Sequence, residues 1–339
     1  MPSNSAAYLT AQGAPLEVKE APYPTPGDGE IIVQNKAIAI NPVDYATQMM
    51  GQAIFPWLQY PAINGYDVAG EVVEVGSNVS NFKVGDRVVA YSAVAFQTYS
   101  TVLAHTAAHI PASTTYEQAS VIPLGLLTAV SGLFGKEYLA LEYPTTNPKP
   151  TGKTVLITGG ATSVGCNAIQ LAVAAGYEVI STSSPKNFDL VKKLGASKVF
   201  DYNSPTVWED VLASFKGKES AGALAITAPG PPGPNPTLTA CFDIVSKVDG
   251  TKFVALTMVP PKEMPEGIGA KFCMPAFVTK DLELSKAIFA DYLTPALAEG
   301  KFTPAPEAKV VGTGLEAIQG ALDKLKKEGV SAAKIVVTL

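Results

Sequence analysis

The chain has 339 residues, of which 47% are hydrophobic and 16% charged, and its formal net charge is −5. This length allows two domains, while the acidic balance and the scattered lysines argue against nucleic acid as a partner. Three widely separated cysteines, no apolar run of about 18 residues and no basic-then-apolar leader argue against a disulfide framework, a membrane span and secretion, so we expect a cytoplasmic protein without a membrane partner.

The first third of the chain is predicted to consist of short strands. Runs at residues 31–34, 72–75 and 87–90 are separated by Pro, Gly, Asn and Asp turn signals. This spacing is typical of a compact barrel rather than of βαβ units. Between these runs, the segment that opens at residues 41–45 and continues to Pro61 is either a bend beside a ligand or an ordinary surface loop.

The middle of the chain alternates between strand and helix patterns. Strands are predicted at residues 154–158, 178–182, 198–202, 223–227 and 252–256, with helices between them, so we expect a doubly wound parallel sheet. The first strand runs into a turn that contains Gly160 and Gly165, and a helix follows at once. The start of such a helix favours an anion, so this turn is a candidate site for the diphosphate of a dinucleotide.

The last part of the chain is predicted to return to the barrel. Residues 308–312 and 334–339 have the pattern of strands, and residues 314–327 that of an amphipathic helix. We therefore expect residues 1–125 and 275–339 to form the barrel domain and residues 126–274 the cofactor domain.

The end of the second predicted strand of the cofactor domain indicates which dinucleotide binds. A site for NADH usually has an acid there that accepts from the ribose 2′-hydroxyl. This strand instead ends in hydroxyls followed by Ser184, Lys186 and Asn187, which favour a 2′-phosphate and hence NADPH. A solvated turn that caps the next helix is the alternative.

A family resemblance rests on three stretches: residues 65–76 (GYDVAGEVVEVG), residues 82–88 (FKVGDRV) and residues 41–44 (NPVD). They resemble the catalytic barrel of the medium-chain dehydrogenases/reductases, and in particular the quinone oxidoreductase and enoyl reductase branch. The resemblance covers nearly the whole chain. It implies an α/β protein with a GroES-like β-barrel catalytic domain and a Rossmann domain with a doubly wound parallel sheet.

The same comparison predicts a protein without zinc. Asn41 and Tyr66 stand where the zinc-dependent branch has a Cys and a His that bind the metal, and the four-cysteine cluster for structural zinc is absent. His105 and His109 are expected on one face of a strand, but a zinc site needs three or four ligands. We therefore expect no metal.

Residues 184–189 (SPKNFD) and 193–202 (KLGASKVFDY) narrow the resemblance to fungal enoyl reductases that act in trans with polyketide synthases. This implies NADPH as cofactor and a transient synthase partner for a monomer or homodimer. The resemblance implies these cofactor-binding residues: Asp44, Gly160, Thr162, Ser163, Val164, Gly165, Ser184, Lys186, Asn187, Tyr202, Leu256, Val330 and Ser331. It implies these substrate contacts: Asn41, Leu124, Leu126 and Thr128, although both leucines can equally be core.

The expected reaction is hydride delivery to the C=C of an α,β-unsaturated carbonyl compound, with quinone reduction as the alternative. Such a reaction needs a hydrogen-bond donor for the developing negative charge. Tyr45 is a candidate, although it can simply pack beside the cleft. Ala46 stands where the polyketide enoyl reductases have a lysine. A protein that binds NADPH without turnover is the alternative outside enzymes.

Overall fold

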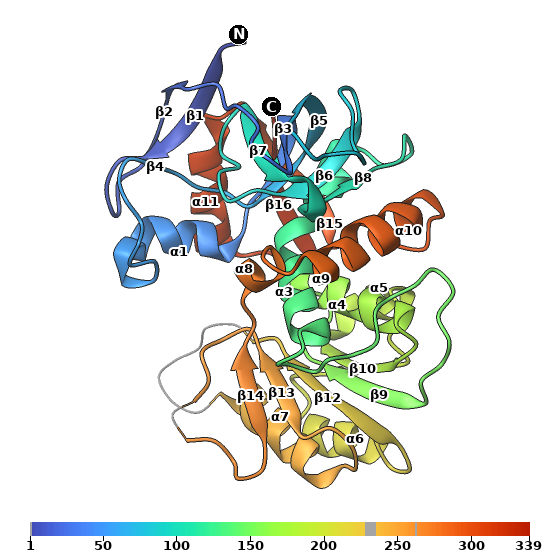
Figure 1. The fold of residues 1–339 in the computed structure, drawn as a ribbon. Coiled ribbons are helices and arrows are strands. Elements are labelled where there is room, and N and C mark those ends of the chain that lie inside the picture. Colours follow the sequence, from blue (N-terminus) through green and yellow to red (C-terminus); the bar gives the residue numbers. More distant parts are fainter. Residues whose placement is uncertain (1, 228–234, 262) are drawn as a thin grey trace. The chain divides into compact units, whose positions relative to one another are not determined.

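The computed structural model describes residues 2–227, 235–261 and 263–339 (Figure 1). The chain divides into two compact units, Met1–Leu124 with Pro304–Leu339 and Gly125–Thr303. The first junction is one residue from the expected one. The return to the first unit comes at residue 304, whereas we expected it at residue 275. Just before it, the Gln170 side chain binds the backbone of Thr303 through two hydrogen bonds of 3.0 and 2.8 Å.

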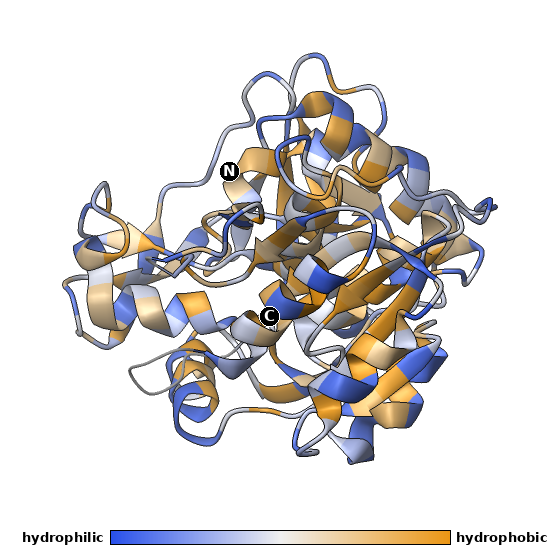
Figure 2. Ribbon diagram, turned by 90° about the horizontal axis from the view of Figure 1, so that it is seen from below, coloured by the Kyte–Doolittle hydropathy of each residue, from blue (hydrophilic) through white to orange (hydrophobic). Residues whose placement is uncertain are grey.

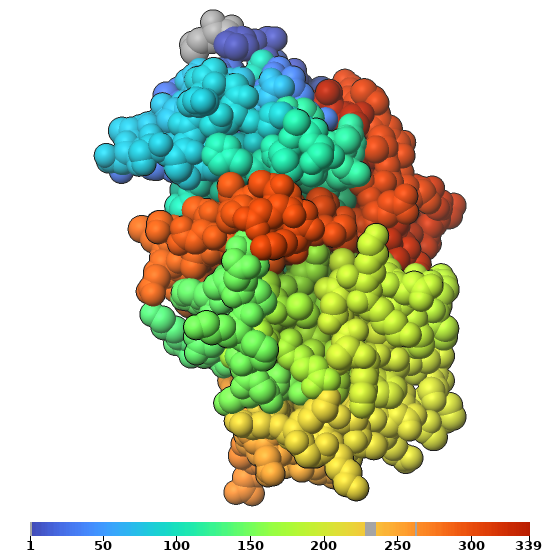
Figure 3. Space-filling view, turned by 90° about the vertical axis from the view of Figure 1, so that its right-hand side faces the viewer, coloured from blue at the N-terminus to red at the C-terminus, as the bar shows by residue number. Residues whose placement is uncertain are grey.

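The first unit is built on a seven-stranded sheet in the order β15-β16-β3-β5-β6-β8, with β7 also paired to β3, and on a three-stranded sheet in the order β2-β1-β4. β16 pairs with β3, and in Figure 3 the dark red end of the chain accordingly lies beside blue residues of this unit. The strands are β1 (Asn4–Leu9), β2 (Leu16–Ala21), β3 (Glu30–Ala39), β4 (Ala62–Ile63), β5 (Asp67–Val75), β6 (Arg87–Tyr91), β7 (Tyr99–Leu103), β8 (Ala107–His109), β15 (Glu307–Thr313) and β16 (Ala333–Thr338).

Of the two longest helices of this unit, the sequence pattern predicted only one. The helix α11 (Ala317–Glu328) buries Ile318, Leu322 and Leu325 in the barrel core, as its amphipathic pattern predicts. The segment expected as a bend or loop instead begins with a nine-residue helix, α1 (Pro42–Met50), which has a proline in its first turn. The remaining short helices are η1 (Gly51–Ala53), η2 (Ala104–Thr106) and α2 (Tyr116–Ser120).

The second unit has a parallel sheet in the order β11-β10-β9-β12-β13-β14. This is the strand order of a Rossmann fold, so the expected fold class is confirmed, and each of the five predicted strands is found. The strands are β9 (Lys153–Ile157), β10 (Glu178–Ser183), β11 (Lys198–Asp201), β12 (Glu219–Ala225), β13 (Phe253–Leu256) and β14 (Gly269–Phe272). The helices are α3 (Pro123–Phe134, which begins in the first unit), α4 (Ser163–Ala174), η3 (Pro185–Asn187), α5 (Phe188–Lys193), α6 (Val207–Ser214), α7 (Pro236–Lys247), α8 (Pro275–Val278), α9 (Leu282–Lys286), the π-helix η4 (Ala287–Leu293) and α10 (Thr294–Ala298).

Hydrophobic residues are concentrated on the strands, and hydrophilic residues on loops and outer helices (Figure 2). Among the described residues, one helical segment, Tyr116–Phe134, is long and apolar enough to cross a membrane by length and composition alone. In the fold, 78% of its apolar window is buried, as in a core helix of a globular protein.

Candidate active site

The glycine-containing turn joins β9 to α4 and is closed by its own side chains. The Thr162 hydroxyl donates to the Gly159 carbonyl over 2.8 Å and accepts from the Gly165 N–H over 3.0 Å. A Cβ at Gly165 would lie 2.2 Å from the Gly159 carbonyl oxygen, so only glycine fits there. Thr162 is therefore the N-cap of α4, and its proton is committed to the turn rather than to a phosphate.

The end of β10 is fastened to this turn. Gly160 donates its N–H to the Thr182 carbonyl over 2.8 Å, and the Gly159 N–H donates to the Thr182 hydroxyl over 3.2 Å. These bonds hold the start of α4, with Ser163 and Val164 in its first turn, beside the carboxyl end of β10. The first N–H groups of a helix lack intrahelical acceptors and favour an anion.

The residues expected to select the cofactor lie together beyond the same edge of the sheet. The Asn187 side chain donates to the Ser184 hydroxyl over 3.1 Å, Lys186 between them is exposed, and Tyr202 is 50% exposed. Tyr202 follows β11, whose last residue is in register with Ser183 of β10. The structure therefore brings these four side chains to neighbouring strand ends.

Other expected contact residues differ in accessibility. Leu256 and Leu126 are fully buried, so their side chains belong to the core. Leu124 and Thr128 are half-buried and lie one helical turn apart on α3, which leaves them on one accessible stripe. Val330 is 43% exposed, and Ser331 beside it is also exposed, in the turn before β16.

In the barrel unit, a buried carboxylate joins three segments of the chain. Asp67, at the start of β5, is fully buried. Its Oδ2 accepts from Asn41 Nδ2 over 2.8 Å and lies 2.5 Å from Lys334 Nζ, while its Oδ1 accepts from the Leu124 N–H over 2.6 Å. Asp67 thus holds Asn41 and Leu124, two expected substrate contacts that are 83 residues apart in the chain (124 − 41 = 83).

Asp44 lies next to this cluster and is itself buried. One carboxyl oxygen accepts from the Asn41 N–H over 2.7 Å, whereas Oδ1 has no hydrogen-bond partner in the described chain. Burial above all raises the pKa of Asp44 to about 8; Asp67 adds to the rise, while Asn41 and Lys334 oppose it. Asp44 is therefore mostly a neutral acid at neutral pH, and it is 1% exposed.

Two tyrosines of this unit have different surroundings. The Tyr45 ring packs against the barrel core. Tyr66, which the sequence indicated only as a replacement for a zinc ligand, is half-buried, and its hydroxyl has a hydrogen bond with the Thr47 side chain. The Tyr66 ring stacks on Tyr91, with ring centroids 5.8 Å apart and an interplanar angle of 26°.

The two histidines do not share a strand. The strand β7 ends at Leu103, His105 lies in the turn η2 and His109 ends β8, so the expected common face is wrong. His109 Nε2 lies 3.0 Å from the Asn81 carbonyl oxygen, and its ring packs on Phe82. Within the described ranges, no three His, Cys, Asp or Glu side chains come together as metal ligands.

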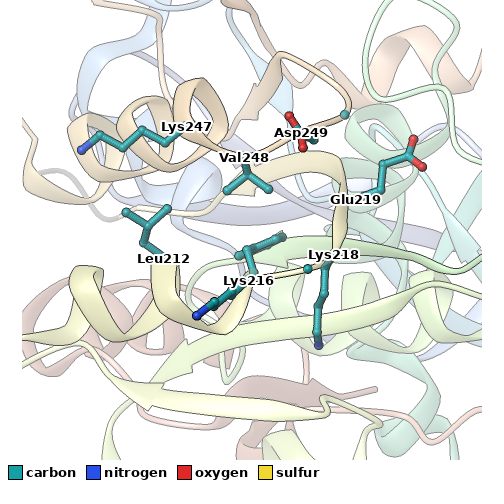
Figure 4. A pocket seen from close by; sticks show the side chains of 10 residues that line it. Leu212, Lys216, Lys218, Glu219, Lys247, Val248 and Asp249 are labelled. Atoms are coloured by element: carbon teal, nitrogen blue, oxygen red, sulfur yellow. The ribbon is translucent and has the colours of Figure 1, made fainter.

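A hollow of about 700 Å³ lies at the amino ends of β12 and β13 in the second unit. It is thus at the other end of the strands from the residues expected to bind the cofactor. Figure 4 shows Leu212 and Val248 in its middle and charged side chains pointing outward. Three of these charges, on Lys218, Lys247 and Glu219, are engaged in ion pairs with Glu178, Asp243 and Lys153. Because ligands of open α/β sheets bind at the carboxyl ends of the strands, this hollow is not the cofactor site.

Comparison with known proteins agrees with this architecture. Residues 27–136 match the alcohol dehydrogenase GroES-like domain. The chain is 53% identical to Dehydrogenase azaJ of Aspergillus niger over all of both proteins, and 37% identical to Trans-enoyl reductase himH of Aspergillus japonicus over 91% of this chain and 90% of that relative. An alcohol dehydrogenase superfamily protein from Novosphingobium aromaticivorans has a TM-score of 0.80 and 26% identity over 99% of both chains.

The fold and the two clusters of side chains define an oxidoreductase with a GroES-like barrel and a Rossmann unit. The chain belongs to the medium-chain dehydrogenase/reductase family, as its full-length identity to azaJ and its domain match show. Its relatives include proteins named dehydrogenases and trans-enoyl reductases.

Proposed function

We propose that the protein is a zinc-independent, NADPH-dependent reductase of α,β-unsaturated carbonyl compounds. The observation that carries the cofactor assignment is the carboxyl end of β10, where Ser184, Lys186 and Asn187 offer donors and a positive charge. The carboxylate of Asp201, at the end of neighbouring β11, accepts from the Asn203 N–H over 2.9 Å and from its side-chain amide over 3.1 Å, so it is already engaged.

The turn between β9 and α4 fits a diphosphate. Backbone approaches so closely at Gly165 that a Cβ would collide with it, and the helix α4 begins with Ser163 and Val164 at this turn. The first-turn N–H groups would hold the phosphates, and Lys186 would lie toward the 2′-phosphate. NADPH held there would supply a hydride for a carbon of the substrate.

The substrate assignment rests on the accessible stripe of α3 and on the relatives. Leu124 and Thr128 present a mainly apolar surface with one hydroxyl, which supports a small hydrophobic substrate. The name of himH supports reduction of an enoyl group. Asn41 and Tyr66 stand where the zinc-dependent branch has metal ligands, and neither an amide nor a phenol is among the usual zinc ligands, which supports the proposal of a metal-free site.

The test is NADPH oxidation by the purified protein with a panel of enones, enals and quinones. We expect consumption of NADPH with enones and enals, and a saturated carbonyl product. Turnover of quinones alone would show the alternative quinone oxidoreductase. Tight NADPH binding with no turnover across the panel would show a binding protein instead.

Metal analysis of the same preparation tests the metal-free part of the proposal. We expect less than stoichiometric zinc and no loss of activity on treatment with a chelator. One zinc ion per chain whose removal abolishes turnover would contradict the assignment.

A further inference from the structure

The barrel unit holds a phenol that is fixed in position but not enclosed. Tyr66 lies directly before β5, and its ring stacks on Tyr91 of β6. Its hydroxyl has a hydrogen bond with the Thr47 side chain on α1. Tyr66 and Tyr91 are half-buried residues, whereas Thr47 is 2% exposed. The ring is therefore held from two elements while part of it remains accessible.

The protonation states around Tyr66 keep it a hydrogen-bond donor. Burial raises the pKa of Tyr66 to about 12; the charge on ionised Asp44 would add to this rise, while the Thr47 contact opposes it. Asp44 itself is mostly neutral below pH 8, because its own pKa is raised by burial. Tyr66 therefore faces no strong base and remains a phenol at neutral pH.

The contact of Tyr66 with Thr47 can be exchanged for a better one. The Thr47 hydroxyl already donates to the Val43 carbonyl over 2.7 Å, and it is a neutral partner for the Tyr66 hydroxyl. A substrate oxygen that gains negative charge is a stronger acceptor than a neutral hydroxyl. The Tyr66 proton would therefore turn to such an oxygen.

Tyr66 is also adjacent in the chain to the residue that holds two expected substrate contacts. The next residue, Asp67, binds the Asn41 side chain and the Leu124 N–H, the two expected substrate contacts of this unit. The other candidates for a donor are poorer, because the Tyr45 ring packs against the barrel core and Ala46 has no polar group.

We propose that the Tyr66 hydroxyl donates a hydrogen bond to the carbonyl oxygen of the unsaturated substrate and is a catalytic residue of the reduction. This role rests on the proposed function. As hydride adds with its electron pair to the β-carbon, the electrons of the C=C bond move toward the carbonyl oxygen. The hydrogen bond from Tyr66 strengthens as this charge grows. The α-carbon then takes a proton from water, which gives the saturated carbonyl, and Tyr66 keeps its own proton.

The central test compares Tyr66→Phe with Tyr116→Phe. The first removes only the hydroxyl and keeps the ring that stacks on Tyr91. The second removes a hydroxyl of the same unit that donates to Glu71 over 2.9 Å, away from the Asp67 cluster. For Tyr66→Phe we expect kcat with an enone to fall by about 100-fold, with little change in KM or in the Kd for NADPH. We expect Tyr116→Phe to keep the wild-type kcat.

A second readout separates catalysis from packing. Electron-withdrawing substituents on an aryl enone stabilise the same negative charge that the donor stabilises. In Tyr66→Phe, log kcat should therefore depend more steeply on the substituent than in the wild type, which a mere packing defect would not cause. If Tyr66→Phe does not fold, fluorinated tyrosines at position 66 keep ring and hydroxyl, and kcat should change with the acidity of the phenol.

The outcomes are distinct. An active wild type with unchanged kcat and unchanged substituent dependence in Tyr66→Phe would overturn the role of Tyr66 and leave the proposed function intact. An equal loss in Tyr116→Phe would also overturn it. A wild type that binds NADPH but reduces no member of the panel would overturn the proposed function, and the role of Tyr66 with it.

Discussion

Asp67 and Lys334 form an ion pair in which Oδ2 and Nζ are 2.5 Å apart, with side chains 0% and 4% exposed. Burial of two charges is costly, so such a pair persists only when its remaining hydrogen-bonding capacity is used. Here the carboxylate also accepts from Asn41 and Leu124, and the ammonium donates to the Val121 carbonyl over 3.3 Å. The pair therefore links β5, α1, the start of α3 and β16.

Removal of one partner should destabilise the barrel unit strongly. Lys334→Met leaves the Asp67 carboxylate buried without its counter-charge, so we expect the free energy of unfolding to fall by about 3–5 kcal/mol. Urea denaturation measures the change. Lys324→Met, which breaks the exposed pair with Glu328 on α11, is the matched control and should cost less than about 1 kcal/mol. Equal effects of the two substitutions would show that the buried pair has no special role.

Asp44 should make stability depend on pH. Its pKa is about 8 in the fold against an ordinary value of 3.8 for aspartate, so the folded chain retains a proton that the unfolded chain has lost. The contribution is therefore fully present below about pH 4 and is lost as the pH rises to 8.

Asp44→Asn should remove this dependence, because an amide can still accept from the Asn41 N–H and does not ionise. Urea midpoints between pH 5 and pH 8 should then decline less in the variant than in the wild type. Asn41, Tyr66, Asp67 and Lys334 surround Asp44 and are unchanged in the comparison. Parallel pH curves for the two proteins would mean that Asp44 is already ionised at neutral pH.

Lys186→Ala should weaken NADPH binding selectively. Loss of one exposed positive charge beside a 2′-phosphate corresponds to about 1 kcal/mol, or roughly a fivefold higher Kd for NADPH. The Kd for NADH should not change. Fluorescence titration measures both, and Lys193→Ala, an exposed lysine at the end of α5, is the control of equal charge. Identical preferences in all three proteins would rule out a 2′-phosphate contact for Lys186.

Gly165→Ala should damage the cofactor turn. The new Cβ would lie 2.2 Å from the Gly159 carbonyl oxygen and 2.8 Å from the Gly160 Cα, so the backbone must shift, at a cost of about 1–3 kcal/mol. We expect a lower melting temperature and much weaker NADPH binding, measured by thermal denaturation and titration. Gly320→Ala on α11 has nothing within 4 Å of the new Cβ and should stabilise the helix by roughly 1 kcal/mol. Unchanged NADPH affinity in Gly165→Ala would exclude the turn as the phosphate site.

The sequence predicted the parts of the fold that local pattern determines. Buried parallel strands and the helices between them have strong periodicity, so β9 to β13 were found within a few residues. The helix α1 was missed because Asn41 and Pro42 have the pattern of a turn, and a proline in the first turn of a helix gives the same signal. The return at residue 304 depends on contacts between residues far apart in the chain, such as those of Gln170 with Thr303, which no local pattern contains.

Site residues that belong to a local motif could be predicted from the sequence. Contacts between residues far apart in the chain could not. Gly165, Ser184 and Lys186 follow strands whose order fixes their position. Lys334 stands alone among apolar residues of a strand, which is a usable signal for a buried ion pair, but nothing nearby in the sequence identifies Asp67 as its partner.

The ion pair also imposes an order of assembly during synthesis. Asp67 leaves the ribosome long before Lys334, and the whole second unit, residues 125–303, is made between them. Domains generally fold as units while the chain is still growing, so the Rossmann unit can be complete while the carboxylate of Asp67 still lacks its counter-charge. The barrel therefore closes around its buried charges only once β16 has been translated, so the barrel unit becomes native after the Rossmann unit.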